Sequence, residues 1–263
     1  MPYQTPPWTQ VIAHRGNSGP LPENTLVAIE SAIGLGVDMV EVDIRLTGDG
    51  IPILMHSSRV DGTTSGMGPV AEFTWNELRS LDAGSWRGPQ FADQTVQALD
   101  EVLDSTRGRV ALNLDIKVPE AAVPTVLAVI EADSFSNVVI SGCTADCVKT
   151  VGEIASGIST LFNLDDLLRE IDPAEAPAVA RRSIDLAVDL GAVAINVPHP
   201  LVDVDLVDQA REAGIGVWAF TIDDAGRFLH LMNAGVASLT TNWPDRMLPL
   251  VPRATSQARI DGS

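Results

Sequence analysis

Two carboxylates sit inside an apolar run early in the chain. Glu41 and Asp43 are separated by one residue within the otherwise apolar residues 40–44. In a β-strand, side chains two residues apart point to the same face, so both carboxylates would face the same way. Burying an ionised carboxylate is costly unless a cation or hydrogen bonds replace the lost water. The pair therefore indicates a bound metal ion, and the alternative is a solvated edge strand.

A short apolar segment upstream ends in three residues of distinct chemistry. His14, Arg15 and Gly16 directly follow the apolar residues 11–13. Histidine transfers protons near neutral pH, arginine holds a phosphate or carboxylate through two hydrogen bonds, and glycine lets the backbone turn sharply beneath a ligand. The tripeptide also occurs by chance, but in this order it is typical of a site that binds an anion and moves a proton.

Local sequence brings a second histidine toward the carboxylate pair. A tight turn at residues 47–50 joins a strand expected at 38–45 to a short strand expected at 51–56, which ends in His56. A connection this short makes a hairpin, so the second strand should run antiparallel to the first. Pairing back from the turn places His56 beside Glu41.

Four further motifs follow along the chain. They are residues 22–25 (Pro-Glu-Asn-Thr), 61–66 (Asp-Gly-Thr-Thr-Ser-Gly), 112–117 (Leu-Asn-Leu-Asp-Ile-Lys) and 240–244 (Thr-Thr-Asn-Trp-Pro). Together with the segments around His14, Glu41 and His56, this succession resembles the compact bacterial form of the glycerophosphodiester phosphodiesterase family. The resemblance extends from Ile12 to about Pro244.

The resemblance implies a role for individual residues. The implied acid/base pair is His14 and His56. The implied metal ligands are Glu41, Asp43 and Asp115. Arg15 and Lys117 would hold the phosphate. Because all of these metal ligands are oxygen atoms, we expect one divalent metal ion, Mg²⁺ or Ca²⁺, in preference to zinc. The implied reaction is metal-dependent hydrolysis of a small glycerophosphodiester to sn-glycerol 3-phosphate and an alcohol.

Three positions depart from the usual pattern of that family. Ser57 stands where an aspartate usually follows the second histidine, Asp115 stands where a longer glutamate is common, and residues 220–223 replace Trp-Thr-Val-Asn with Phe-Thr-Ile-Asp. The shorter Asp115 side chain could place a water molecule between its carboxylate and the metal. None of the three changes removes a charge from the expected site.

Four more residues are candidates for substrate binding, each with an ordinary alternative. Glu23 and Asn24 precede a helix expected at 25–35, where they would contact substrate or support the site, and helix capping alone would explain Asn24 or Thr25. Trp218 and Phe220 share a face near the end of an expected strand. They would line a leaving-group pocket or pack in the core.

The elements that must position these residues alternate along the chain. Eight β-rich segments are expected near residues 10–14, 38–45, 109–116, 137–141, 158–163, 192–197, 215–221 and 236–241. Most precede an amphipathic helical stretch, and repeated strand-helix units of this length imply parallel pairing. Eight such units close a TIM (β/α)8 barrel, whose active site lies at the carboxyl ends of its strands. The strand at 51–56 would be an extra antiparallel hairpin strand.

The chain length suits one domain of this kind, since 263 residues bury roughly three quarters of their surface in a single fold. We expect a barrel domain over residues 1–252, with a small insertion at about 57–93 over the active-site end, and a polar tail at 253–263. Trp75 and Trp86 are expected to anchor a small core within the insertion.

The two cysteines, Cys143 and Cys147, are four residues apart near a helix expected to start at Thr144. A disulfide across one helical turn is geometrically awkward, and no neighbouring histidine completes a zinc site. We therefore expect free thiols.

Charge and composition exclude several partners. With 35 acidic and 17 basic residues, the formal net charge is −18, which argues against binding nucleic acid or an anionic membrane. A phosphate must therefore be attracted locally. The start lacks a basic, apolar leader and no stretch approaches 18 apolar residues, so we expect a cytoplasmic protein without stable membrane association. The sequence makes no prediction of oligomeric state.

Two functions of a different kind stay open. One is a phospholipase D-like hydrolase of lysophospholipids or sphingolipids, which would require a long acyl chain for turnover. The other is a non-catalytic barrel that binds a phosphodiester, which the departures at Ser57 and Asp115 would permit. The charges retained on apolar strands argue against the latter. The leaving alcohol, the assignment of acid and base, and attack by water or by a glycerol hydroxyl also stay open.

Overall fold

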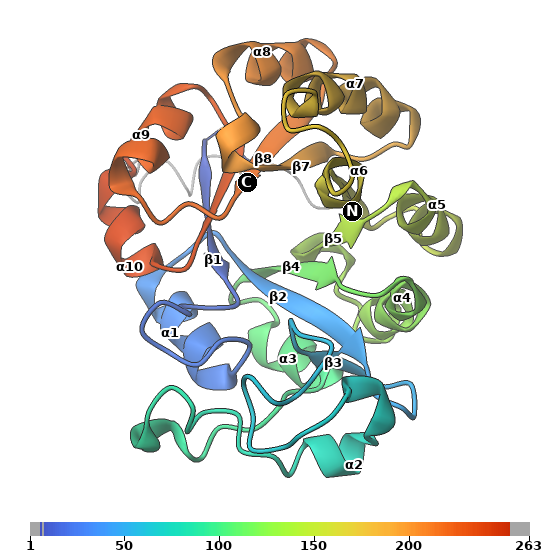
Figure 1. Cartoon of the computed structure of the whole chain (residues 1–263), viewed down its shortest axis with the longest axis vertical. Coiled ribbons are helices and arrows are strands. Elements are labelled where there is room, and N and C mark those ends of the chain that lie inside the picture. The colour runs from blue at the N-terminus through green and yellow to red at the C-terminus, as the bar shows by residue number, and fades with distance from the viewer. Residues whose placement is uncertain (1–5, 7, 253–263) are drawn as a thin grey trace.

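The computed structural model describes residue 6 and residues 8–252, drawn in Figure 1. The polar tail expected at 253–263 lies outside the described residues.

Eight parallel strands form a closed barrel. They are β1 (Gln10–His14), β2 (Met39–Leu46), β4 (Ala111–Ile116), β5 (Val138–Cys143), β6 (Ser159–Asn163), β7 (Ala194–Pro198), β8 (Gly216–Phe220) and β9 (Ser238–Thr241). Each pairs in parallel with its neighbours, and pairing of β1 with both β9 and β2 closes the ring. The short β3 (Pro52–Leu54) pairs antiparallel with β2. The TIM barrel with one extra hairpin strand is therefore confirmed.

Helices surround the barrel (Figure 1). The longer ones are α1 (Leu26–Leu35), α3 (Leu99–Thr106), α4 (Ala122–Glu131), α5 (Ala145–Ile154), α7 (Ala176–Asp189), α8 (Val204–Glu212) and α9 (Ala225–Asn233), and the short ones are α2 (Trp75–Leu78), α6 (Asp165–Leu168) and α10 (Pro244–Met247). The side chains of Thr144, Asp203 and Asp224 cap α5, α8 and α9 by accepting a backbone N–H. No helix within the described ranges is long and apolar enough to span a membrane.

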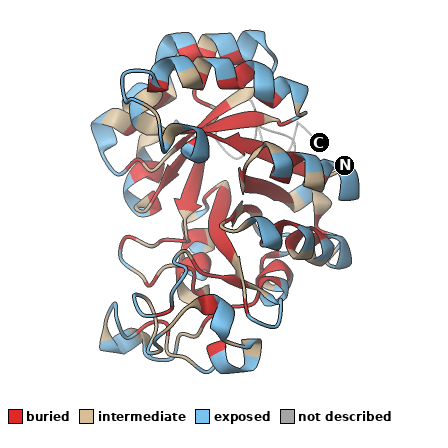
Figure 2. Ribbon diagram, turned by 45° about the vertical axis from the view of Figure 1, so that its right-hand side comes forward, coloured by how far each residue is buried: buried red, intermediate tan, exposed pale blue. Residues whose placement is uncertain are grey.

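The core lies in two layers, as Figure 2 shows by the buried strands and the buried inner faces of the helices. The outer layer packs the helices against the strands. The inner layer fills the barrel, and its members are Ile12, Met39, Val139, Leu161, Ala194 and Trp218. The barrel interior is thus packed below the carboxyl ends of the strands, as this architecture requires.

The segment between β3 and α3 packs around a small core of its own. Its buried members are Ile53, Met55, Val60, Val70, Leu78, Ala83 and Val96. Trp75 packs against this cluster as expected, whereas Trp86 is 41% exposed. The prediction for Trp86 was wrong because its indole N–H bonds to the Ala83 carbonyl and Arg87 lies over its ring, which keeps the ring at the surface.

Candidate active site

Three carboxylates from two neighbouring strands converge at one end of the barrel. Glu41 and Asp43 lie on β2, and Asp115 lies on β4 directly opposite Asp43. Glu41 and Asp43 are 3% and 0% exposed, so the solvated edge-strand alternative is excluded. One oxygen from each residue lies within 4.8 Å of the others, a grouping that could hold a metal ion within the described part of the chain.

Arg15 and Lys117 each form an ion pair with Asp43. Arg15 Nε lies 3.0 Å from Asp43 Oδ2, and Lys117 Nζ lies 2.9 Å from Asp43 Oδ1. Lys117 Nζ also reaches Asp115 Oδ2 at 2.6 Å. Burial alone would raise the pKa of Asp43, but Lys117 and Arg15 hold it well below its ordinary value. Asp43 is therefore a fixed negative charge in this site.

The negative charges of Glu41 and Asp115 are less well compensated by neighbouring cations than that of Asp43. Burial, reinforced by the Asp43 and Asp115 carboxylates, raises the pKa of Glu41 well above its ordinary value. Glu41 Oε2 accepts a hydrogen bond from Arg15 N at 2.9 Å, while Oε1 is buried without a partner. Burial also raises the pKa of Asp115 to about 6. An oxygen-only cluster with an unpartnered buried oxygen fits a divalent cation, which would restore both carboxylates to their charged forms.

His14 is held in one orientation by a chain of hydrogen bonds. Its Nδ1 lies 2.7 Å from Asn242 Oδ1, and Asn242 Nδ2 donates to Asp223 Oδ2 at 2.7 Å. Because the Asp223 carboxylate can only accept, the Asn242 carbonyl must face His14, so His14 donates from Nδ1 and keeps Nε2 free to accept a proton. Burial, with a contribution from Arg15, lowers the pKa of His14 to about 4. His14 is thus neutral at neutral pH, with Nε2 3.8 Å from Glu41 Oε2.

His56 reaches the same cavity from the hairpin. The turn is one residue longer than expected, because Thr47 N bonds to the Ile51 carbonyl and Leu46 pairs with Pro52. Continued past the end of β3, this register would place His56 opposite Val42, so the expected pairing with Glu41 was wrong by one residue. Burial lowers the pKa of His56, and Arg45 Nε donates to its backbone carbonyl at 2.8 Å.

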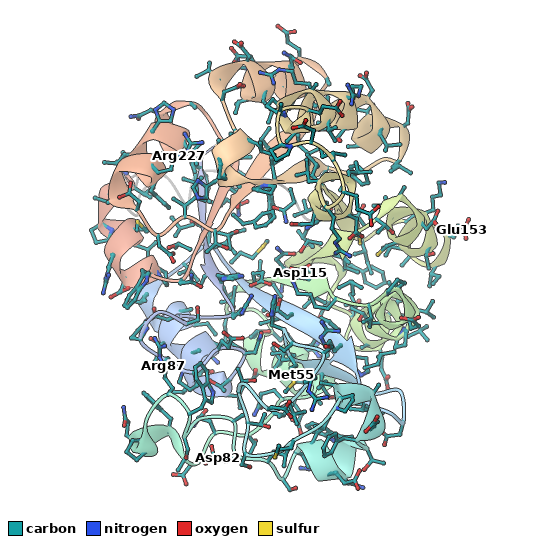
Figure 3. All side chains as sticks on the ribbon, in the orientation of Figure 1. Met55, Asp82, Arg87, Asp115, Glu153 and Arg227 are labelled. Atoms are coloured by element: carbon teal, nitrogen blue, oxygen red, sulfur yellow. The ribbon has the colours of Figure 1, made fainter. Side chains whose placement is uncertain are left out.

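A cavity of about 490 Å³ opens above these groups. The predicted residues that line it are His14, Arg15, Glu41, His56, Asp115, Lys117 and Phe220. Asp115 lies on β4, the strand beside β2, and is labelled near the middle of the barrel in Figure 3. Arg45 also lines the cavity, and the sequence contained its signal, since it follows Asp43 by two residues and shares its face of β2.

Glu23 and Asn24 support the site from beside the cavity and do not line it. Glu23 Oε1 accepts from Arg15 at 2.9 Å. Asn24 adopts a positive φ of 57° and exchanges two hydrogen bonds with Asp43, from its own Nδ2 at 2.8 Å and from the Asp43 backbone N–H at 3.2 Å. The capping alternative fails for Asn24, because Thr25 is the residue that precedes the first turn of α1.

Trp218 lies away from the cavity. It is 1% exposed and packs in the inner barrel layer, so the structure favours the core alternative, whereas Phe220 lines the cavity. The two side chains do share a face of β8, but Phe220 lies two positions further along the strand, toward its carboxyl end.

Replacing Trp218 with phenylalanine should therefore affect stability and leave substrate binding unchanged. The smaller ring leaves space in the barrel core, and we expect the free energy of unfolding to fall by about 1–3 kcal/mol. Urea denaturation would measure the loss, and KM for a glycerophosphodiester would be measured in parallel. An increase in KM with unchanged stability would show that Trp218 contacts substrate.

Comparisons with known proteins agree with this geometry. Residues 14–246 match the sequence model of the glycerophosphoryl diester phosphodiesterase family. A glycerophosphodiester phosphodiesterase of Caldanaerobacter subterraneus subsp. tengcongensis is 30% identical over 249 residues, 92% of this chain and 98% of the relative. One from Bacillus subtilis is 27% identical over 252 residues, 89% of this chain and 83% of the relative.

A solved structure carries a ligand of direct interest. An Oleispira antarctica phosphodiesterase, solved in complex with the product sn-glycerol-3-phosphate, superimposes with a TM-score of 0.78 at 28% identity. The match covers 97% of this chain and 98% of that one. Family, relatives and structure all agree with the family resemblance that the sequence indicated. The chain belongs to the glycerophosphoryl diester phosphodiesterase family, and its activity is that of a glycerophosphodiester phosphodiesterase.

Proposed function

We propose that this enzyme hydrolyses small glycerophosphodiesters in a metal-dependent reaction and releases sn-glycerol 3-phosphate and an alcohol. The observation that carries the proposal is a cluster of three carboxylates, paired with the Arg15 and Lys117 cations, at a cavity that two histidines also line. The product bound to the Oleispira protein supports the same product here.

The carboxylates Glu41, Asp43 and Asp115 would hold the divalent ion, and their oxygen-only donor set favours Mg²⁺ or Ca²⁺. When bound, such an ion supplies positive charge to the phosphoryl oxygens and lowers the pKa of a hydroxyl or water. Arg15 and Lys117 add the charge that binds the phosphate in a protein of net charge −18. Both cations are already positioned by Asp43, so binding requires little reorganisation.

The two histidines would divide the proton transfers. His14 presents an unprotonated Nε2 and would accept the proton of the attacking hydroxyl. His56 would donate a proton to the departing alkoxide, and it lines the same cavity. Whether water or the neighbouring glycerol hydroxyl attacks can be tested with a phosphodiester that lacks this hydroxyl, because an enzyme that forms a cyclic phosphate cannot turn it over.

The cavity lining argues against a long-chain lipid substrate. Its larger apolar side chains are Ile116, Val118, Pro119 and Phe220, among a majority of polar and charged residues. An acyl chain would require a continuous apolar surface.

The decisive experiment is to strip the protein of metal and measure release of glycerol 3-phosphate from glycerophosphocholine and glycerophosphoethanolamine. We expect no release without metal and restored release with Mg²⁺, Ca²⁺ or Mn²⁺. Turnover of lysophosphatidylcholine alone would favour the phospholipase D-like alternative. Folded protein that is inactive with every metal and substrate would favour the non-catalytic one.

Replacing Asn24 with glycine should weaken metal binding. Glycine accepts the positive φ at this position, so the change removes the buried side chain and its two hydrogen bonds to Asp43 without straining the backbone. Groups that orient a metal ligand are worth roughly 10–100-fold in affinity, and we expect a loss of that size in the metal titration of activity, with kcat at saturating metal changed less. An unchanged metal affinity would show that Arg15 and Lys117 suffice to hold Asp43.

A further inference from the structure

The two cysteines of this chain meet on the wall of the catalytic cavity. Cys143 is the last residue of β5, and Cys147 lies in the first turn of α5. Both line the cavity, and their thiols share a hydrogen bond. Both are free thiols, as expected. The helical-turn argument against a disulfide does not apply, because Cys143 lies on a strand and α5 starts only after Thr144.

The environment makes the two thiols unequal. Cys147 accepts the hydrogen bond from Cys143, and this bond lowers the pKa of the Cys147 thiol against the opposing effects of burial and of Asp115. The first turn of a helix also favours a thiolate. The same hydrogen bond, together with burial, raises the pKa of the Cys143 thiol well above its ordinary value. Cys147 is 7% exposed and Cys143 is 0% exposed, so a small reagent in the cavity meets Cys147 first.

We propose that Cys143 and Cys147 form a redox-active dithiol that hydroperoxides oxidise to an intramolecular disulfide. The Cys147 thiolate attacks one oxygen of the peroxide, the O–O bond breaks, and the other oxygen leaves as water or an alcohol after taking up a proton. The Cys147 sulfenic acid is then attacked by the Cys143 sulfur, which loses its proton, and a second water leaves as the S–S bond forms. The two thiols are oxidised by two electrons in total and the peroxide is reduced.

Next to the dithiol, the backbone packs against Asp115, a proposed metal ligand. Gly142, next to Cys143, adopts a φ of +70° at an irregularity in the pairing of β5 with β6. Its backbone packs so closely on β4 that an added Cβ would lie 2.2 Å from Asp115 Oδ1. A disulfide brings two sulfurs closer than hydrogen-bonded thiols can come. Its formation would shift Cys143 and, with it, the Gly142 backbone that packs on Asp115. We expect oxidation to lower activity several-fold and a dithiol reductant to restore it.

The chemical test does not depend on the enzymatic activity. No lysine or arginine lies between Lys117 and Lys149, so trypsin releases both cysteines in one peptide, residues 118–149. Treatment of the folded protein with hydrogen peroxide should lower the mass of this peptide by about 2 Da, reversibly on reduction. Cys143→Ser and Cys147→Ser should abolish that loss. Phenylarsine oxide bridges two adjacent thiols, so it should block both cysteines of the wild type. Neither serine variant should bind the reagent stably, because each has a single thiol in this peptide.

Two results would overturn the proposal. One is a peptide that keeps both thiols under peroxide treatment that oxidises methionines elsewhere in the folded protein. The other is an equal loss of activity in the wild type and in both serine variants, each compared with its own reduced form. The activity measurement rests on the proposed function, whereas the mass measurement does not. A disulfide in a protein without phosphodiesterase activity would therefore reject the proposed function and retain the dithiol.

Discussion

Replacing His14 with alanine is expected to reduce kcat/KM for glycerophosphocholine by about 10²–10⁴-fold, the usual contribution of a positioned general base. The variant loses the unprotonated Nε2 that His14 presents 3.8 Å from Glu41 Oε2, while the carboxylates and their cations stay in place. Metal affinity and thermal stability should therefore change much less than the rate. Single-turnover measurements at saturating metal would separate the chemical step from binding.

His230→Ala is the matched control, because His230 lies on α9 outside the cavity. This variant should retain the wild-type rate. Near-full turnover by the His14 variant would reject the acid/base assignment. A comparable loss in the His230 variant would show that the substitution acts through folding.

Replacing Glu41 with glutamine should have opposite effects on activity and stability. Activity should fall by about a hundredfold or more, since a bound metal contributes several kcal/mol to charge stabilisation in the transition state and Glu41 would be one of its ligands. The metal-free variant, however, should unfold at a higher temperature than the metal-free wild type at neutral pH, because one of three crowded carboxyl groups has become neutral.

The sign of the pH effect follows from the raised pKa of Glu41. A group whose pKa is higher in the folded than in the unfolded state stabilises the fold fully below its unfolded pKa of about 4.5, and this contribution is lost as the pH rises through the folded value. The difference in melting temperature between the Glu41 variant and the wild type should thus grow from pH 4.5 toward neutral pH. Added Mg²⁺ or Ca²⁺ should raise the melting temperature of the wild type and reverse the order.

Glu153→Gln provides the control for this comparison. Glu153 lies on α5 at the periphery of the molecule (Figure 3), so its neutralisation removes the same charge far from the triad. Its melting temperature should respond to metal as the wild type does. If the Glu41 variant instead binds metal and melts like the wild type, Glu41 is not a ligand.

Sequence patterns predicted the barrel well because the periodicity of apolar residues and the lengths of the turns are local properties of the chain. The alternation in residues 40–44 indicated two carboxylates on one face of a strand, and the short turn indicated an antiparallel hairpin. The depth of a side chain along the barrel axis is not local. Trp218 and Phe220 share a face, but only closure of the barrel decides that one is packed inside and the other borders the cavity.

The hydrogen bonds around His14 were also beyond the reach of sequence. Asp223 was visible only as a departure from a family pattern, and Asn242 only as part of a motif. Their role depends on an Asp223–Asn242–His14 chain whose members are up to 228 residues apart. Likewise, the contact between Cys143 and Cys147 depends on β5 continuing to Cys143, two residues beyond the end of the expected strand, before α5 begins.

Closure of the barrel between β1 and β9 has a consequence for how the enzyme becomes active. The carboxylates and Lys117 come from β2 and the end of β4, which are neighbours early in the chain, whereas His14 on β1 is oriented by Asn242, which directly follows β9. A chain that has folded only its first half could therefore assemble the charged cluster without an oriented base. Asn242 can orient the base only when the last strand is in place, so the complete site depends on the complete barrel.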